Sequence, residues 1–141
     1  MTQDTALTEP GVTSKLSPQS VADTVARLTD LVTVKGMKLF AVIDQSAEAR
    51  QAGLDLRDTV LVIFGSPAAG TPVMVTSPLA ALDMPLKVLI WDNAGQTNVT
   101  YYAPAALATR HHLSADMAAK LAGIDPLTDA LIAPMNYVPC R

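Results

Sequence analysis

Residues 59–92, TVLVIFGSPAAGTPVMVTSPLAALDMPLKVLIWD, decide the fold of this chain. The segments at 59–64 and 86–91 are apolar, of strand length and rich in β-branched residues, so each is predicted to be a strand near the centre of a sheet. A loop rich in glycine and proline at 65–72 and an interrupted helix separate the two strands. The stretch therefore predicts a sheet with helices beside it, and the loop is the first candidate location for a site.

The size and composition of the chain predict one globular domain. At 141 residues it is long enough to bury about two thirds of its unfolded surface around a single core. Half of the residues are hydrophobic, only 16% are charged, and the mean hydropathy is +0.28. So few charges leave apolar surface uncovered, which is typical of a subunit interface. We expect a homo-oligomer, most simply a dimer.

Charge and hydropathy exclude several classes of protein. The net charge is −3 and the basic residues are scattered, so nucleic acid is not an expected partner. No run approaches the roughly 20 apolar residues of a membrane-spanning helix, and the N-terminus does not resemble a signal peptide. The single cysteine, Cys140, permits no internal disulfide and no cysteine-based metal cluster. A cytoplasmic protein without membrane contact is expected.

The first part of the chain predicts an edge strand, a helix, a strand and a short helix. Residues 1–11 are polar and read as a loose arm, followed by a short edge strand at 12–16. Ser17 and Pro18 are predicted to cap a helix that ends at Gly36. Residues 37–43 are predicted to form a strand covered on both faces. Asp44 opens a short helix that ends at Gly53.

The second part predicts a kinked helix, a hairpin and three short helices. Thr71 and Pro72 are predicted to start the helix, Pro78 to interrupt it, and residues 83–85 to end it. The strands at 86–91 and 97–102 are predicted to form a hairpin around the loop at 92–96. Helices are then expected at 104–112, 114–121 and 125–133, with Ser114 and Asp125 as caps and a tail at 134–141.

Several motifs together resemble the bacterial and archaeal family of domain of unknown function 302. They are FAVID at 40–44, AGL at 52–54, LVIFGSP at 61–67 followed by Gly70-Thr71-Pro72, and ALDMPLK at 81–87. Further matches extend the resemblance to roughly residues 12–133. The resemblance implies a compact domain that commonly forms homodimers, and it implies no established reaction. Many relatives carry histidine after the first strand aspartate, where this chain has Gln45 after Asp44, which weakens an acid–base role there.

The predicted fold class is α+β. We expect a single compact domain at 12–133, with a mixed, largely antiparallel sheet of about four or five strands and helices packed on one face.

The loop at 65–72 carries the strongest candidate site. Its two glycines are spaced as in a phosphate-binding P-loop, but the lysine of that motif is replaced by Thr71 and Pro72, which excludes a nucleoside triphosphatase. The remaining hypothesis is an anion seat near Gly70, formed by helix N-terminal amides and the hydroxyls of Ser66 and Thr71. The alternative is that these residues only cap a helix and form a tight turn.

Charged and aromatic residues outside the loop give further candidates, each with a structural alternative. Asp83 and Lys87 are predicted to face one another as a functional charge pair. The alternatives are a structural salt bridge, or a Lys87 that buries its stem and extends its charged end to solvent. Asp44 either pairs with Asp83 or caps a helix. Tyr102 and Trp91 line a pocket with His111, or the aromatic residues belong to the core or to an interface. Adjacent His111 and His112 point about 100° apart on a helix, so no metal site and no cofactor are expected.

Three functions remain open at this point. The first is a homodimeric, cytoplasmic protein that binds a small anionic ligand at the loop, with Asp44, Lys87 and Tyr102 as neighbours. The second is an enzyme of unknown class that uses Asp83, Lys87 or His111 for proton transfer. The third is a structural or regulatory interaction protein whose apolar surface is the functional part.

Overall fold

The computed structural model describes residues 9–134, so the predicted arm up to residue 8 and the tail with Cys140 lie outside the described residues. Five strands form one sheet: β1 (Val12–Ser17), β2 (Lys38–Asp44), β3 (Thr59–Gly65), β4 (Leu86–Asn93) and β5 (Gln96–Tyr102). The helices are α2 (Val21–Val34), α3 (Gln45–Gln51), α4 (Pro67–Thr76), the 3₁₀ helix η1 (Pro78–Asp83), α5 (Pro104–Arg110), α6 (Ala115–Ala119) and α7 (Ile124–Ile132).

The strand order is β1-β5-β4-β3-β2, and every neighbouring pair is antiparallel. The α+β class and the largely antiparallel pairing are therefore confirmed, and the described strands include no parallel pair that would make the sheet mixed. β4 lies at the centre and β3 beside it, which confirms both apolar segments of the quoted stretch as interior strands. The first two strands along the chain, β1 and β2, form the two edges of the sheet.

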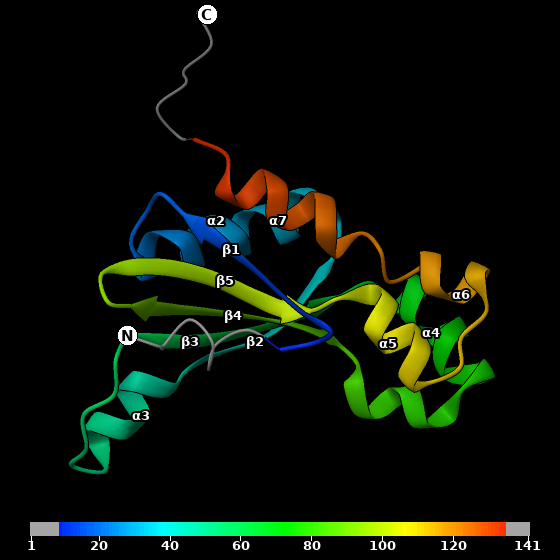
Figure 1. The fold of residues 1–141 in the computed structure, drawn as a ribbon, viewed down its shortest axis with the longest axis horizontal. Helices are drawn as coiled ribbons and strands as arrows, with labels where there is room; N and C mark the ends of the chain where they lie inside the picture. The colour runs from blue at the N-terminus through cyan, green and yellow to red at the C-terminus, as the bar shows by residue number, and fades with distance from the viewer. Residues whose placement is uncertain (1–8, 135–141) are drawn as a thin grey trace, which may run out of the picture.

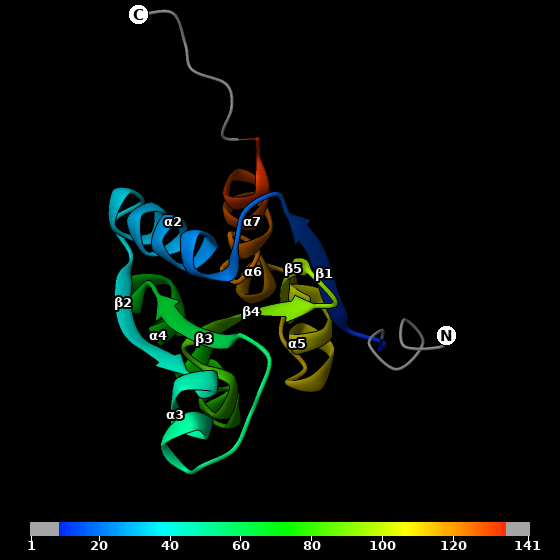
Figure 2. The ribbon, with the colours of Figure 1, turned by 90° about the vertical axis from the view of Figure 1, so that its left-hand side faces the viewer.

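Helices α2 and α7 lie side by side over one face of the sheet (Figures 1 and 2). Side chains of β3, β4 and β5 that point to this face form the core with them: Val60, Val62, Phe64, Val88, Ile90, Val99 and Tyr101. The helices α4, α5 and α6 gather at one end of the sheet, and α3 lies on the other side from α2 (Figure 1). Much of the second face is consequently accessible, and Leu16 and Tyr102 on it are 55% and 45% exposed.

Helix α2 begins three residues later than predicted. Its cap is Ser20, whose Oγ accepts a hydrogen bond from the Asp23 amide at 3.0 Å. Ser17, the predicted cap, instead shares a hydrogen bond with the hydroxyl of Thr24 at 2.8 Å. Both serines satisfy the sequence preference for a cap, and the buried contact to Thr24 decides between them. The predicted end at Gly36 is confirmed by its φ of +76°.

The strand β2 is not covered on both faces, which corrects the prediction. It pairs only with β3, and Phe40 and Val42 are 45% and 44% exposed. An apolar run favours a strand, but it does not distinguish an edge position from an interior one. The interior positions of this sheet belong to β3, β4 and β5, and β5 is the last of the five strands in the sequence.

Helix α4 begins at Pro67, so the predicted start at Thr71 and Pro72 is wrong. Ser66 is the cap, and its Oγ accepts a hydrogen bond from the Ala69 amide at 3.3 Å. Ser66-Pro67 is the same pairing of a cap residue with proline at the first helical position, five residues earlier. The predicted interruption is confirmed, because α4 ends at Thr76 and η1 begins at Pro78.

The hairpin between β4 and β5 is confirmed, with a shorter loop than predicted. Its turn is the pair Ala94-Gly95, with φ values of 54° and 92°. Positive φ at both central residues is typical of a two-residue type I′ turn, whose twist matches that of the flanking strands. The strands therefore run closer to the turn, with Asn93 opposite Gln96.

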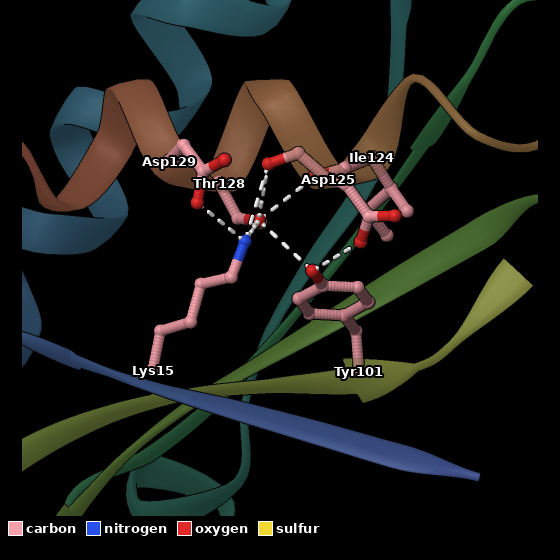
Figure 3. A network of polar contacts seen from close by, with 6 residues as sticks. All are labelled: Lys15, Tyr101, Ile124, Asp125, Thr128 and Asp129. Atoms are coloured by element: carbon pink, nitrogen blue, oxygen red, sulfur yellow. Dashed lines mark hydrogen bonds and ion pairs between the residues drawn. The ribbon is translucent and has the colours of Figure 1, made fainter.

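The last helices follow the prediction, except for the cap of α7. Ser114 caps α6 as expected. Helix α7 begins at Ile124, so Asp125 lies in its first turn and accepts a hydrogen bond from the hydroxyl of Tyr101 at 2.6 Å. Beside it, Lys15 Nζ of β1 donates to Thr128 Oγ1 at 2.7 Å and to Asp129 Oδ1 at 2.8 Å (Figure 3). This polar cluster fixes α7 on the sheet.

No helix among residues 9–134 combines the length and the apolar character needed to span a membrane.

Candidate functional site

The accessible face of the sheet carries a groove of about 250 Å³, which we call the Lys87 groove. It is lined by Val12, Leu61, Lys87, Leu89, Thr100, Tyr101 and Tyr102. The strand register brings these residues together: Leu89 lies opposite Leu61 on β3 and opposite Thr100 on β5, and Val12 lies opposite Tyr102. Two predicted site residues, Lys87 and Tyr102, are thus neighbours on one face.

Lys87 is half-buried in the groove and has no ion pair among residues 9–134. Residues that alternate along a strand, and residues directly opposite across strands, share a face of a sheet. Counted this way, no strand of the described chain places an aspartate or glutamate on the face of Lys87. Asp44 and Asp92 lie in the other set, opposite Val60 and Thr97. Within the described residues the groove therefore combines apolar walls with a lysine that has no ion-pair partner.

A chain of contacts leads from the groove to a second polar cluster. The guanidinium carbon of Arg110 lies 5.5 Å from the centre of the Tyr102 ring, a cation–π distance. Arg110 Nη1 is 3.1 Å from Asp83 Oδ2, and the same carboxylate oxygen is 2.6 Å from Nε2 of His111. Two more predicted residues, Asp83 and His111, are thus brought together, and Arg110 connects them to Tyr102.

The environment of Asp83 favours its ionised form. Burial opposes ionisation, but the hydrogen bonds from His111 and Arg110 outweigh it, so the pKa of the Asp83 carboxyl is lowered from its ordinary 3.8. A hollow of about 310 Å³ lies next to this cluster and is lined by Ser77, Arg110, His111 and His112, among others. A carboxylate that orients an imidazole is an arrangement that acid–base catalysis uses.

Two predicted pairs are wrong. Asp83 does not pair with Lys87, because its carboxylate is held by Arg110 and His111. Asp44 does not pair with Asp83 either: Asp44 lies opposite Val60, whereas β4 begins opposite Phe64, at the other end of β3. Asp44 instead caps helix α3, which is the alternative that the sequence analysis gave for it. Hydrogen bonds from the Ser46 hydroxyl and the Ala47 amide lower its pKa.

The loop at 65–72 borders only a small, mainly apolar hollow of about 120 Å³. Most amides of the first turn of α4 are already used: Pro67 has no N–H, and the amides of Ala69 and Gly70 both bond to the Ser66 carbonyl. Gly70 is buried inside the helix, and a Cβ there would meet Met84 Cε at 2.8 Å. Thr71 is exposed in mid-helix. The anion-binding site at this loop stays a prediction. Its proposed use of Thr71 assumed that the helix starts at this residue, and the helix starts at Pro67 instead.

A further hollow of about 450 Å³ lies between the start of α2 and the β4–β5 turn. Its charged lining residues are Asp58 and Asp92, so its electrostatic field repels anions. No group of three or more His, Cys, Asp or Glu within residues 9–134 is placed to hold a metal ion.

The sequence prediction missed most of the groove. The sequence predicts strands, but no functional role, for four groove residues: Val12, Leu61, Leu89 and Thr100. It also does not predict Arg110 as the partner of Asp83. A signal for the groove was present in the hairpin: a two-residue turn at Ala94-Gly95 fixes the register, and that register places Tyr102 beside Lys87. The predicted five-residue loop at 92–96 does not specify which residues of the two strands lie opposite each other.

The fold and the groove define a small α+β domain with one helix-covered and one accessible sheet face. A family model described as "Domain of unknown function DUF302" matches residues 12–131, and the chain belongs to this family. In fold it is similar to the crystal structure of an uncharacterized conserved protein DUF302 from Bacillus stearothermophilus. The TM-score is 0.74, at 16% identity over 88% of this chain and 97% of that one.

Two relatives found by sequence similarity are named as ion channels. Over 118 residues the chain is 38% identical to the protein named fluoride-specific ion channel FluC 1 of Brucella suis, covering 82% of this chain and 46% of that protein. The match to FluC 1 of Brucella abortus has the same identity and covers 44% of that protein. This chain therefore spans less than half the length of these relatives.

Proposed function

We propose that this chain is a small-molecule-binding domain whose ligand is an anion bound in the Lys87 groove. The observation that carries the proposal is the half-buried side chain of Lys87, whose ammonium group has no ion-pair partner within residues 9–134. Removing a charge from water costs free energy unless a counter-charge is near. An anion in the groove supplies that counter-charge, and Tyr102, which carries a hydroxyl group, also lines the groove.

The test is an NMR titration of the ¹⁵N-labelled protein with sodium hexanoate, benzoate, phosphate and fluoride. For at least one anion we expect saturable shifts at the amides of Leu61, Lys87, Leu89 and Thr100. Lys87→Met should abolish them, and Lys35→Met, which removes an exposed charge next to α2, should leave them unchanged. If none of the four anions shifts these amides at millimolar concentration, the proposal is wrong.

The channel relatives favour an anion as the ligand. We infer that the matched part of those proteins is a domain of this fold attached to the channel, because no helix of residues 9–134 could span a membrane. The name of those proteins specifies fluoride, a small anion. This is the reason for including fluoride in the titration.

A second function, proton transfer by an enzyme, is favoured by the 2.6 Å contact between Asp83 and His111 beside a hollow. Turnover of p-nitrophenyl acetate and p-nitrophenyl phosphate by the wild-type protein would be the first test. If this function is correct, His111→Gln and Asp83→Asn lose the turnover and Lys87→Met keeps it. Turnover that survives in His111→Gln, or that is absent from the wild type, contradicts catalysis of these two reactions by the pair.

We also propose that the protein works as a cytoplasmic homodimer, with the edge strand β2 at the contact. Support comes from Leu39, Phe40 and Val42, which are between 38% and 45% exposed on a strand edge that has no neighbour in the described chain. An open apolar edge is a ready template for a second strand. Sedimentation equilibrium should give a dimer for the wild type and a monomer for Phe40→Asp. A monomeric wild type would refute the dimer.

A further inference from the structure

We propose that the ligand of the Lys87 groove is a monocarboxylate with a short hydrocarbon chain. This inference rests on the proposed function and names the class of its ligand. The carboxylate binds the ammonium group of Lys87, and the hydrocarbon lies along the apolar side chains of Leu61 and Leu89. The argument has three steps: the charge of the groove, the nature of its walls and its size.

The charge of the groove selects a monoanion. Lys87 is the one formally charged side chain among the groove residues. Arg110 contacts Tyr102 but is already paired with Asp83. A dianion such as phosphate would therefore keep one charge without a partner against apolar walls, which is unfavourable. A single carboxylate is matched by a single ammonium group.

The walls of the groove select a ligand with hydrocarbon. Lys87 lies opposite Ile63 on β3, and in the next row Leu89 lies opposite Leu61, whose neighbour on β2 is Ile43. A carboxylate on Lys87 therefore has a continuous apolar surface beside it. A bare inorganic anion leaves this surface in water, whereas each methylene laid on it is transferred out of water and raises the affinity about fourfold.

The size of the groove limits the hydrocarbon. At about 250 Å³ it is smaller than the roughly 300 to 1,000 Å³ of sites for drug-sized molecules. The groove therefore suits chains of about six carbons better than long fatty acids, which would extend beyond it. Hexanoate is the probe that meets all three conditions.

The protein contains its own reporter for this site. Trp91 is the single tryptophan of the chain, and its indole Nε1 donates a hydrogen bond of 2.9 Å to Thr100 Oγ1. Thr100 lines the groove, so a bound ligand changes the surroundings of the indole. Tryptophan fluorescence of the full-length protein can therefore follow binding without a label.

The test compares hexanoate with acetate, hexanol and sodium fluoride in fluorescence titrations at constant ionic strength. We expect saturable binding of hexanoate, affinities at least tenfold weaker for acetate and hexanol, and no saturation with fluoride. Lys87→Met should weaken hexanoate at least tenfold and change hexanol less than twofold. Lys87→Arg, which keeps the charge, should restore much of the affinity, and Lys35→Met is the matched control. Circular dichroism verifies that each variant is folded.

Three results would overturn the inference, and they differ in what they say about the proposed function. If acetate or fluoride binds as tightly as hexanoate and binding depends on Lys87, the groove is an anion site and the hydrocarbon class is wrong. If hexanoate and hexanol bind alike and Lys87→Met changes neither, both the class and the anion proposal fail. If no probe saturates, the monocarboxylate class is wrong, and the anion proposal is then decided by benzoate and phosphate in the NMR titration.

Discussion

Lys15 and Lys87 are both strand lysines, on opposite faces of the same sheet, and their surroundings differ. Lys15 faces α7 and donates hydrogen bonds to Thr128, Asp129 and the carbonyl of Asp125. Lys87 faces the groove and has no such partners among the described residues. A charge whose hydrogen-bonding capacity is met within the fold needs no ligand. The comparison explains why Lys15 is assigned to stability and Lys87 to binding.

Replacing Lys15 with methionine should destabilise the protein by about 2 kcal/mol, because a partly buried charged donor loses its bonds to α7. Urea unfolding followed by circular dichroism measures the change. Lys35→Met removes an exposed lysine and should stay within about 0.5 kcal/mol of the wild type. Equal effects of the two substitutions would show that the Lys15 cluster does not contribute to stability.

At the residue level, only part of the site could be predicted from sequence. Lys87 was recognisable as a charge at an otherwise apolar strand position, and its neighbour Tyr102 follows from the hairpin turn. The contact of Asp83 with His111 was not predictable, because it joins the end of η1 to the end of α5, 28 residues later. Such a contact depends on how helices pack at the end of the sheet, which no local pattern specifies.

At the level of elements, the two candidate starts of α4 can be tested against each other. Ser66→Ala should destabilise the protein by about 1 kcal/mol, because the Ala69 amide loses its side-chain acceptor. Thr71→Ala should be neutral or slightly stabilising, since Thr71 is exposed in mid-helix and alanine has the higher helix propensity. Thermal unfolding of both variants measures the difference. A larger loss for Thr71→Ala would place the helix start at residue 71.

The elements themselves were largely predictable, and their positions in the sheet were not. The periodicity of Val21, Leu28 and Val32 and the apolar runs of β3 and β4 gave these segments correctly. The edge position of β2 was missed because its sequence is as apolar as that of an interior strand. Its exposure follows from the strand order, in which β5 pairs with β4 and β1 and no strand pairs with the outer edge of β2. Strand order is a long-range property that a local sequence pattern does not contain.

For the whole molecule, stability should decrease at acidic pH. The pKa values of Asp83 and Asp44 are lowered in the fold from 3.8, so their contribution is complete above pH 3.8 and is lost as the pH falls through the folded-state values. Urea unfolding at a series of pH values below 5 measures this decrease. Asp83→Asn should make the curve shallower, and Asp116→Asn, at an exposed position, should not. Parallel curves for the wild type and Asp83→Asn would contradict the role of Asp83.

Stability should also decrease at alkaline pH. Burial and the hydrogen bond to Asp125 raise the pKa of Tyr101 above 10.0. Burial lowers the pKa of Lys15, but hydrogen bonds to Asp129 and Tyr101 outweigh it and raise the pKa above 10.5. Both contributions are complete below pH 10 and are lost as the pH rises through the folded-state values. Unfolding curves between pH 9 and 11.5 should show the loss, and the double variant Lys15→Met/Tyr101→Phe should flatten them.

The pairing of β1 with β5 also determines how late during translation the sheet can be completed. Val12 lies opposite Tyr102, so the first of the five strands along the chain pairs with the last. Helix α2 emerges early, yet part of the apolar surface that covers Leu28 and Val32 comes from β4, β5 and α7. Until those segments are made, this stripe is exposed to water and to other nascent chains, which favours aggregation. We therefore expect its folding during synthesis to benefit more from chaperones, or from rapid translation, than that of a domain built from neighbouring hairpins.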